Sequence, residues 1–203
     1  MNRTKRDIQL GFTKEYKPES NHICLIYDND EQRQKIVSDF MAVGIREGEL
    51  VRYFTDRTEP EQIRSWLLNM GIELSDIEKN GSFIVANAEK AYCPNGKFDP
   101  QEMIDGCIQR YKLAEEAGQS CVRSCGEMSW VFKNIPGSER WLEYEALLNT
   151  VDVSFPHIGM CQYDARLFDG ATLFRVLQLH PYMIAQGQIV SNPYYIKTEE
   201  QNK

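Results

Sequence analysis

The sequence predicts an α/β fold in which a mainly parallel sheet is covered by helices on both faces. Short apolar runs, such as residues 23–27, are unbroken and bounded by polar residues, which is typical of strands buried on both faces. Between these runs, apolar residues recur at spacings of three and four, as they do on the inner face of a helix. Strands that alternate with helices in this way form parallel sheets with right-handed crossovers.

The length of 203 residues and the hydrophobic content of 42% suffice for one sizeable core but not for two. We therefore expect one domain over residues 21–197. A flexible arm over residues 1–20, which has few apolar anchors, should precede it, and a short tail over residues 198–203 should follow.

Five strands and a final hairpin follow from the apolar runs. The strands are expected at residues 23–27, 50–55, 83–86, 120–125 and 157–163. The hairpin is expected to pair residues 182–184 with residues 189–190 around Gly187. It would extend the sheet in the antiparallel sense.

The helices are indicated by their boundary residues. Gly44 is expected to end the first helix, and Thr58 to open the second with a capping box. Asp99, Ser138 and Asp169 are expected to cap three further helices. Residues 89–98 read as a loop, with a lid as one interpretation.

Charge and composition exclude several classes of partner. The formal net charge of -7 argues against direct binding to nucleic acid or to an anionic membrane, because both require a basic surface. No apolar run approaches the roughly 18 residues of a membrane-spanning helix. We expect a cytoplasmic protein whose six cysteines are reduced thiols.

Polar and aromatic residues follow the predicted strands where these strands end. The carboxyl ends of parallel strands converge on one edge of a sheet, where ligands usually bind. Carboxylates mixed with aromatic rings suit a small organic ligand, and an acidic first loop favours a neutral or cationic one. We predict that the ligand-binding residues are Tyr27, Asp28, Glu31, Asp56, Arg123, Glu127, Trp130, Tyr163 and Asp164. Taken singly, each of them is more often an ordinary loop residue.

The loop after the first strand lacks the residues that bind phosphate. A P-loop requires glycines, a lysine and a hydroxyl residue in the pattern GxxxxGK[ST]. Residues 28–36 contain no glycine, and their only lysine, Lys35, precedes Ile36. Each pair of negative charges about 4 Å apart would cost roughly 4 kcal/mol at an effective dielectric of about 20. The sequence therefore predicts a fold without a Walker A motif.

Two alternatives to a site for a small organic ligand remain open. Glu127 follows the fourth strand, where it would polarise water in a divergent ATPase. Arg123 lies in that buried strand and needs an anionic partner, either Glu127 or a ligand carboxylate.

The second alternative is a metal, haem or corrinoid module that uses His22, Cys24 and Cys161, which the strand pattern brings together. No paired CxxC or HxxxH unit supports a zinc site, so we expect no resident cofactor. His180 reads as a structural histidine with satisfied hydrogen bonds.

Several separated motifs resemble one known family, the MEDS (methanogen/methylotroph, DcmR-type) sensory domain. The motifs are HICLIY with the acidic loop after it, IREGELVRYFTD, MCQYDARLFDG and VLQLHPYMIAQGQIVSNPYYI. The resemblance extends from about His22 to Ile196. It implies a three-layer RecA-like or KaiC-like core that has lost its phosphate loop. The family-typical positions that this sequence shares are His22, Cys24, Tyr27, Glu31, Cys161, Tyr163, Asp164, His180 and Pro181.

The resemblance implies a role in sensing one-carbon or related small compounds in signal transduction or transcription regulation. Members often carry a DNA-binding or signalling domain, and neither end of this sequence is long enough for a helix-turn-helix. We therefore expect a stand-alone sensor without catalytic residues. It would act through a regulatory protein partner or a homo-oligomer.

Overall fold

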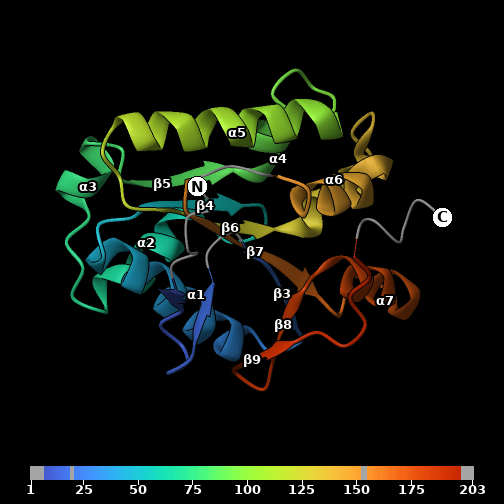
Figure 1. Cartoon of the computed structure of the whole chain (residues 1–203), viewed down its shortest axis with the longest axis horizontal. Helices are drawn as coiled ribbons and strands as arrows, with labels where there is room; N and C mark the ends of the chain where they lie inside the picture. Colours follow the sequence, from blue (N-terminus) through green and yellow to red (C-terminus); the bar gives the residue numbers. More distant parts are fainter. Residues whose placement is uncertain (1–6, 19–20, 152–154, 198–203) are drawn as a thin grey trace, which may run out of the picture.

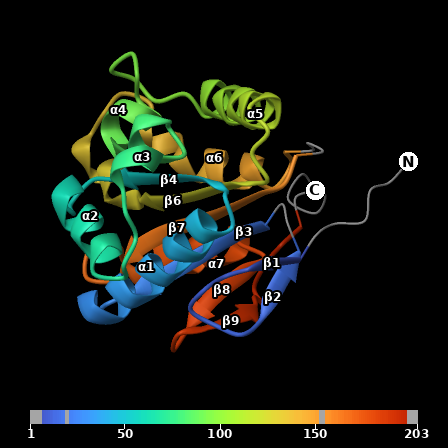
Figure 2. The same cartoon turned by 90° about the vertical axis from the view of Figure 1, so that its left-hand side faces the viewer.

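The computed structural model describes residues 7–18, 21–151 and 155–197, and shows a sheet between two layers of helices. Helices α4, α5 and α6 cover one face of the sheet, and α1 and α2 cover the other (Figures 1 and 2). This arrangement confirms the α/β fold class with helices on both faces. No helix in the described ranges has the length and apolarity to span a bilayer.

The main sheet contains seven strands in the order β5-β4-β6-β7-β3-β8-β9. Strands β5, β4, β6, β7, β3 and β8 pair in parallel, and β9 pairs antiparallel with β8. The strand bounds are β3 (Asn21–Tyr27), β4 (Leu50–Thr55), β5 (Phe83–Asn87), β6 (Val122–Glu127), β7 (His157–Asp164), β8 (Tyr182–Ala185) and β9 (Gln188–Ser191). All five predicted strands and the hairpin are confirmed. Gln186 and Gly187 both have positive φ in the hairpin turn.

Seven α-helices and two short 3₁₀ helices appear in the described part of the chain. The α-helices are α1 (Asp30–Arg46), α2 (Pro60–Leu68), α3 (Ser75–Lys79), α4 (Ala88–Tyr92), α5 (Pro100–Glu116), α6 (Trp141–Leu148) and α7 (Gly170–Leu179). The 3₁₀ helices are η1 (Met128–Lys133) and η2 (Ser138–Arg140). Asp99 and Asp169 cap α5 and α7 as predicted, through backbone amides of the first turns.

Four predictions about helix boundaries are wrong, of which that for Gly44 is described below. Thr58 does not cap α2, because its hydroxyl accepts hydrogen bonds from Arg33 instead. Ser138 lies in η2 and not at the cap of α6. The predicted loop over residues 89–98 begins within α4, whose last residue, Tyr92, is buried with Cys93 against the sheet.

The alternation of side chains along each strand divides the core into two parts. On β7, Ile158 and Met160 pack in the cluster under α1 and α2, whereas Cys161 and Tyr163 pack in the cluster under α4, α6 and α7. Residues that are adjacent in sequence at the strand ends therefore lie on opposite faces of the sheet.

The N-terminal segment packs more firmly than the sequence predicts. Strands β1 (Asp7–Gln9) and β2 (Tyr16–Pro18) pair with each other, and Ile8 and Leu10 are buried in the core under α1. The prediction of a flexible arm is therefore wrong for residues 7–18, because two apolar side chains anchor them. Residues 1–6, 19–20 and the predicted tail over 198–203 lie outside the described residues.

Gly44 lies inside α1 and does not end it, which corrects the sequence prediction. The helix continues to Arg46. A Cβ atom at Gly44 would lie 2.5 Å from Arg123 Nε and 2.9 Å from Glu49 Oε2. The glycine is required because the ion pair between Arg123 and Glu49, at 2.5 Å, passes directly beneath the helix.

We predict that Gly44→Ala lowers the free energy of unfolding by about 1–3 kcal/mol, because the new methyl group would displace this buried ion pair. Gly106→Ala in α5 is the matched control, since its Cβ would meet only the flexible Arg110 side chain, at 3.4 Å. This control should gain up to about 1 kcal/mol from helix propensity. Urea unfolding of both variants measures the difference, and equal effects would contradict the assignment.

Candidate functional site

A buried hydrogen-bond network lies at the carboxyl end of the sheet on the α1 face. Glu127 Oε1 accepts hydrogen bonds from Arg33 Nη2 at 2.6 Å and from the Tyr53 hydroxyl at 2.7 Å. Glu127 Oε2 accepts from the backbone amides of residues 56–58, at 3.0, 2.6 and 3.2 Å. Gln162 Oε1 accepts from Arg33 Nε at 2.7 Å. The network fixes the loop after β4 to the N-terminal part of α1.

The Glu127 carboxylate is ionised and fully engaged. Burial raises its pKa, but the Arg33 charge and the hydrogen bonds from Thr58, Tyr53 and Arg57 outweigh burial, so that the pKa lies below its ordinary value. Both oxygens already accept hydrogen bonds from protein donors, so the carboxylate is poorly placed to activate water. This geometry weighs against the ATPase interpretation.

Arg123 has a different partner and position from those predicted. It lies near the start of β6, away from the carboxyl ends of the strands, and its ion pair is with Glu49 and not with Glu127. Its Nη2 also donates to the Gln9 carbonyl oxygen at 3.0 Å. The correct partner was not evident from sequence because Glu49 is 74 residues away.

The other predicted ligand-binding residues lie in several different environments. Tyr27, Glu31 and Asp164 line an open groove, in which Asp164 and Asp30 are both bound by Arg166. Asp28 is exposed, and the Asp56 carboxylate accepts a hydrogen bond from the Ser129 hydroxyl. Trp130 and Tyr163 are fully buried among aromatic rings.

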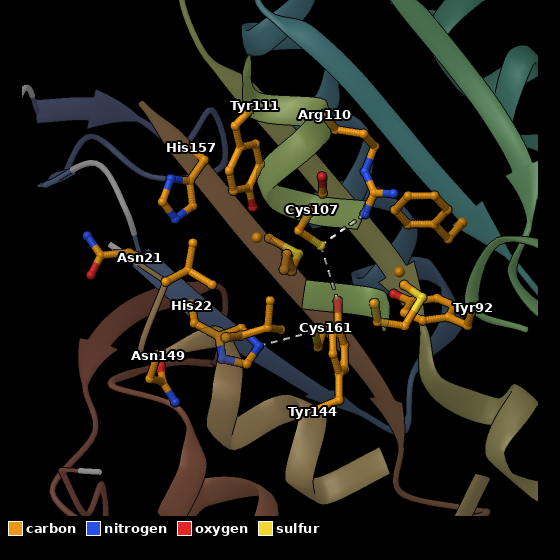
Figure 3. A pocket seen from close by; sticks show the side chains of 18 of the residues that line it. Asn21, His22, Tyr92, Cys107, Arg110, Tyr111, Tyr144, Asn149, His157 and Cys161 are labelled. Atoms are coloured by element: carbon orange, nitrogen blue, oxygen red, sulfur yellow. Dashed lines mark hydrogen bonds between the residues drawn. The ribbon is translucent and has the colours of Figure 1, made fainter. Parts of the chain in front are cut away.

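A partly open cavity lies on the opposite face of the sheet, under α5 and α6. Its volume is about 220 Å³, and apolar or aromatic side chains and polar groups contribute to its lining in about equal parts (Figure 3). His22, Arg110, Tyr111 and Asn149 are among these polar side chains. The Arg110 guanidinium donates to Cys107 Sγ at 2.9 Å. Sequence analysis missed this cavity because its residues come from helices and strands far apart in the chain.

Four potential metal ligands meet beside this cavity. We call them the His/Cys/Glu cluster: His22, Glu145, Cys161 and His180, whose donor atoms all lie within 4.8 Å of one another. His22 Nε2 lies 2.9 Å from Glu145 Oε2 and 3.3 Å from Cys161 Sγ, and His180 Nε2 lies 3.2 Å from Glu145 Oε2. All four residues are buried.

Burial and mutual proximity shift the protonation of the cluster. Burial raises the pKa of Glu145, but the two neighbouring histidines outweigh burial and lower it to about 2. Burial and the nearby His180 lower the pKa of His22 to about 4. The pKa of Cys161 is raised well above its ordinary value by burial and by the Glu145 charge.

The sequence prediction of this cluster was partly correct. His22 and Cys161 do meet, but Cys24 is not among the four, and its Sγ donates to the Tyr182 carbonyl oxygen at 3.7 Å. Glu145 was missed, although it lies at helical spacing between Trp141 and Leu148 on the apolar face of α6, an unusual place for a carboxylate. His180 was read as fully satisfied, but only its Nδ1 has a hydrogen-bond partner among the described residues.

The comparison with protein families shows to which family this chain belongs. The profile named MEDS, the methanogen/methylotroph, DcmR sensory domain, matches residues 21–181. The chain belongs to the MEDS family. The predicted resemblance is therefore confirmed, and the MEDS domain contains both the groove and the His/Cys/Glu cluster.

A curated relative supports a sensory or regulatory role for this MEDS domain. The transcriptional repressor DcmR of Methylorubrum extorquens (strain DSM 6343 / CIP 106787 / DM4) is 27% identical over 163 residues, which cover 79% of this chain. The match covers 58% of the repressor, so the chain spans less than two thirds of its relative.

Solved structures confirm the RecA-like and KaiC-like description of the fold. The KaiC-like protein PH0186 of Pyrococcus horikoshii OT3 superposes with a TM-score of 0.59 at 14% identity, covering 89% of this chain and 80% of that chain. The uncharacterized protein PH0321 of Pyrococcus horikoshii, in complex with an unknown peptide, gives a TM-score of 0.64 at 13% identity, covering 85% and 82%. At these identities the likeness concerns the fold alone.

We predict that Glu127→Gln lowers the free energy of unfolding at pH 7 by about 3–5 kcal/mol, because it leaves the buried Arg33 charge unpaired. The Glu127 pKa is lower in the folded chain, so its stabilisation is present above the ordinary pKa of about 4.3 and disappears as the pH falls through the folded value. The difference between wild type and variant should therefore shrink between pH 7 and pH 3.

Urea unfolding at the two pH values tests this prediction. Glu61→Gln is the control, because Glu61 pairs with Arg64 on the surface with a side chain 81% exposed. Its effect should stay below about 1 kcal/mol at both pH values. A Glu127 variant as stable as this control would show that the network contributes little.

Proposed function

We propose that this MEDS domain senses a small organic molecule that binds in the cavity between α5, α6 and the sheet. The observation that carries the proposal is the lining of the cavity, in which aromatic and apolar side chains share the surface about equally with polar groups that could orient a ligand. The volume of about 220 Å³ is smaller than the roughly 300–1,000 Å³ of pockets for drug-sized ligands. It suits a compound of a few heavy atoms and is too small for a haem or corrinoid ring.

The cavity is a better candidate than the strand-end groove that the sequence suggested. At the groove and the network beside it, the main charges are already paired, Arg33 with Glu127 and Arg166 with Asp30 and Asp164. A ligand there would have to compete with these pairs. In the cavity, Arg110 donates a hydrogen bond to the Cys107 sulfur and to no other group among the described residues. We therefore expect a ligand with a small apolar body and a hydrogen-bond acceptor directed at Arg110.

The family and its curated relative support one-carbon and related compounds as the ligand class. Binding would pass to a regulatory partner or to a second copy through α5 and α6, because both helices line the cavity and form part of the surface layer of the domain (Figure 2). A ligand can shift the equilibrium between two conformations of the domain only if it binds one of them more tightly than the other. No catalytic step is part of this proposal.

A thermal-shift screen of halogenated and oxygenated one-carbon compounds, methylated amines and methylated thiols tests the proposal. A ligand at 100 times its Kd should stabilise the folded chain by about 2.7 kcal/mol. We predict that Gly159→Ile removes this shift without unfolding the protein. Gly159 lines the cavity on β7, and a Cβ atom there would meet nothing within 4 Å, so the larger side chain would grow into the cavity.

Two matched variants separate the alternatives. Gly170→Ala, at another glycine with open space around its Cβ and outside the cavity lining, should keep the full shift. Tyr27→Leu in the groove should also keep it. Loss of the shift in Tyr27→Leu with retention in Gly159→Ile would place the ligand in the groove and overturn the proposed site.

A further inference from the structure

The His/Cys/Glu cluster has the spacing of a tetrahedral metal site. A tetrahedral zinc ion has bonds of about 2.0–2.3 Å to nitrogen, oxygen and sulfur, which places neighbouring ligands roughly 3.3–3.7 Å apart. Three separations in the cluster are 2.9, 3.2 and 3.3 Å, of which two fall just below this range and one at its lower limit. All donor atoms lie within 4.8 Å of one another, so small side-chain movements would bring them around one ion. The four residues come from β3, α6, β7 and the end of α7, so the fold itself brings them together.

The Glu145 carboxylate has no hydrogen-bond partner, although it is completely buried. Both oxygens lack a donor among the described residues. His22 and His180 lie within 3.2 Å of Oε2, but their ring geometry is not that of a hydrogen bond to it. A buried carboxylate whose lone pairs are not satisfied by hydrogen bonds is costly. Its surroundings therefore suit a positively charged group between the donor atoms.

The orientation of His180 points to the same conclusion. Its Nδ1 lies 2.8 Å from the Val176 carbonyl oxygen, and only an N–H group can donate to a carbonyl. In a neutral ring, Nε2 then carries a lone pair, and this lone pair faces the Glu145 oxygen. Two acceptors in contact require either a proton or a cation between them. A backbone carbonyl that fixes the ring in this way is the common arrangement for metal-binding histidines.

Charge and donor type favour a divalent transition metal. With Glu145 as a carboxylate and Cys161 as a thiolate, a divalent cation makes the buried site neutral. Imidazole and thiolate ligands both suit zinc, whereas magnesium and calcium prefer oxygen ligands.

We propose that the His/Cys/Glu cluster binds one divalent transition-metal ion, with Zn²⁺ as the best match. Coordination forms a metal–sulfur bond and releases the Cys161 thiol proton to solvent, so that two negative ligands balance the two positive charges. His22 and Cys161 also line the cavity, so the ion would lie in its wall (Figure 3). The inference goes beyond the proposed sensing function and does not depend on it.

Titration of the full chain with Co²⁺ tests the site. The protein is purified without an affinity metal and treated with chelator, and Co²⁺ replaces Zn²⁺ as a visible probe. We expect one Co²⁺ per chain, with the absorption of tetrahedral thiolate-bound cobalt, and bleaching on addition of Zn²⁺. Zn²⁺ alone should raise the melting temperature, because it binds the folded state.

Two variants and one matched control assign the ligands. Cys161→Ser and His180→Asn should each weaken Co²⁺ binding by more than about tenfold. The asparagine amide can still donate to the Val176 carbonyl while Nε2 is removed. Cys24→Ser is the control, because Cys24 is buried and pairs in register with Cys161 on the neighbouring strand but lies outside the cluster. It should bind Co²⁺ like wild type.

Three outcomes would overturn the proposal. The first is wild-type Co²⁺ binding far below one ion per chain, and the second is equal loss in the Cys24 and Cys161 variants. The third is a porphyrin or corrinoid absorption band in the purified protein. The wild-type titration requires no variant to fold. The organic-ligand screen has a separate readout, so either proposal can fail while the other stands.

Discussion

The buried carboxylate of Glu127 is the interaction on which the α1 face of the sheet depends. Five hydrogen bonds from α1, β4 and the loop after β4 converge on it. A buried charge persists only when it is paired and its lone pairs are satisfied, and both conditions hold here. The same network places the Arg33 guanidinium at the carboxyl end of β3, where a phosphate-binding loop would need open backbone amides. At this end of a KaiC-like fold, the protein's own side chains thereby pair the Arg33 charge.

The two sites that we propose for a ligand and a metal lie on the other face of the sheet. The cavity and the His/Cys/Glu cluster lie together under α5 and α6, separated from the Glu127 network by the thickness of one sheet. Sheet alternation enforces the separation, because Gln162 joins the Arg33 network while its neighbours Cys161 and Tyr163 face the other way. One strand, β7, thus contributes to both regions.

Local sequence patterns predicted the architecture well because strands and helix starts depend on interactions between residues that are close in sequence. Unbroken apolar runs identified the strands, and Asp99 and Asp169 identified two helix starts through amides only two or three residues away. The errors arose where a distant residue decided the outcome. Gly44 is a glycine because of an ion pair beneath α1 and not because a helix ends there. The Thr58 hydroxyl accepts hydrogen bonds from Arg33 and does not cap α2. Ile8 and Leu10 pack into a core formed by residues distant in sequence, which the N-terminal sequence does not reveal.

The sequence by itself determined the α/β class, the absence of a phosphate loop and membership of the MEDS family, since all three follow from contiguous motifs. It also indicated that His22 and Cys161 would approach each other, because strand period fixes which side chains share a face. Only the tertiary structure decided the partners of the buried charges, namely Glu49 for Arg123 and Arg33 for Glu127. It alone added Glu145 and His180 to the cluster and formed the cavity beside it. Such pairings depend on how helices pack across a sheet, which no local spacing encodes.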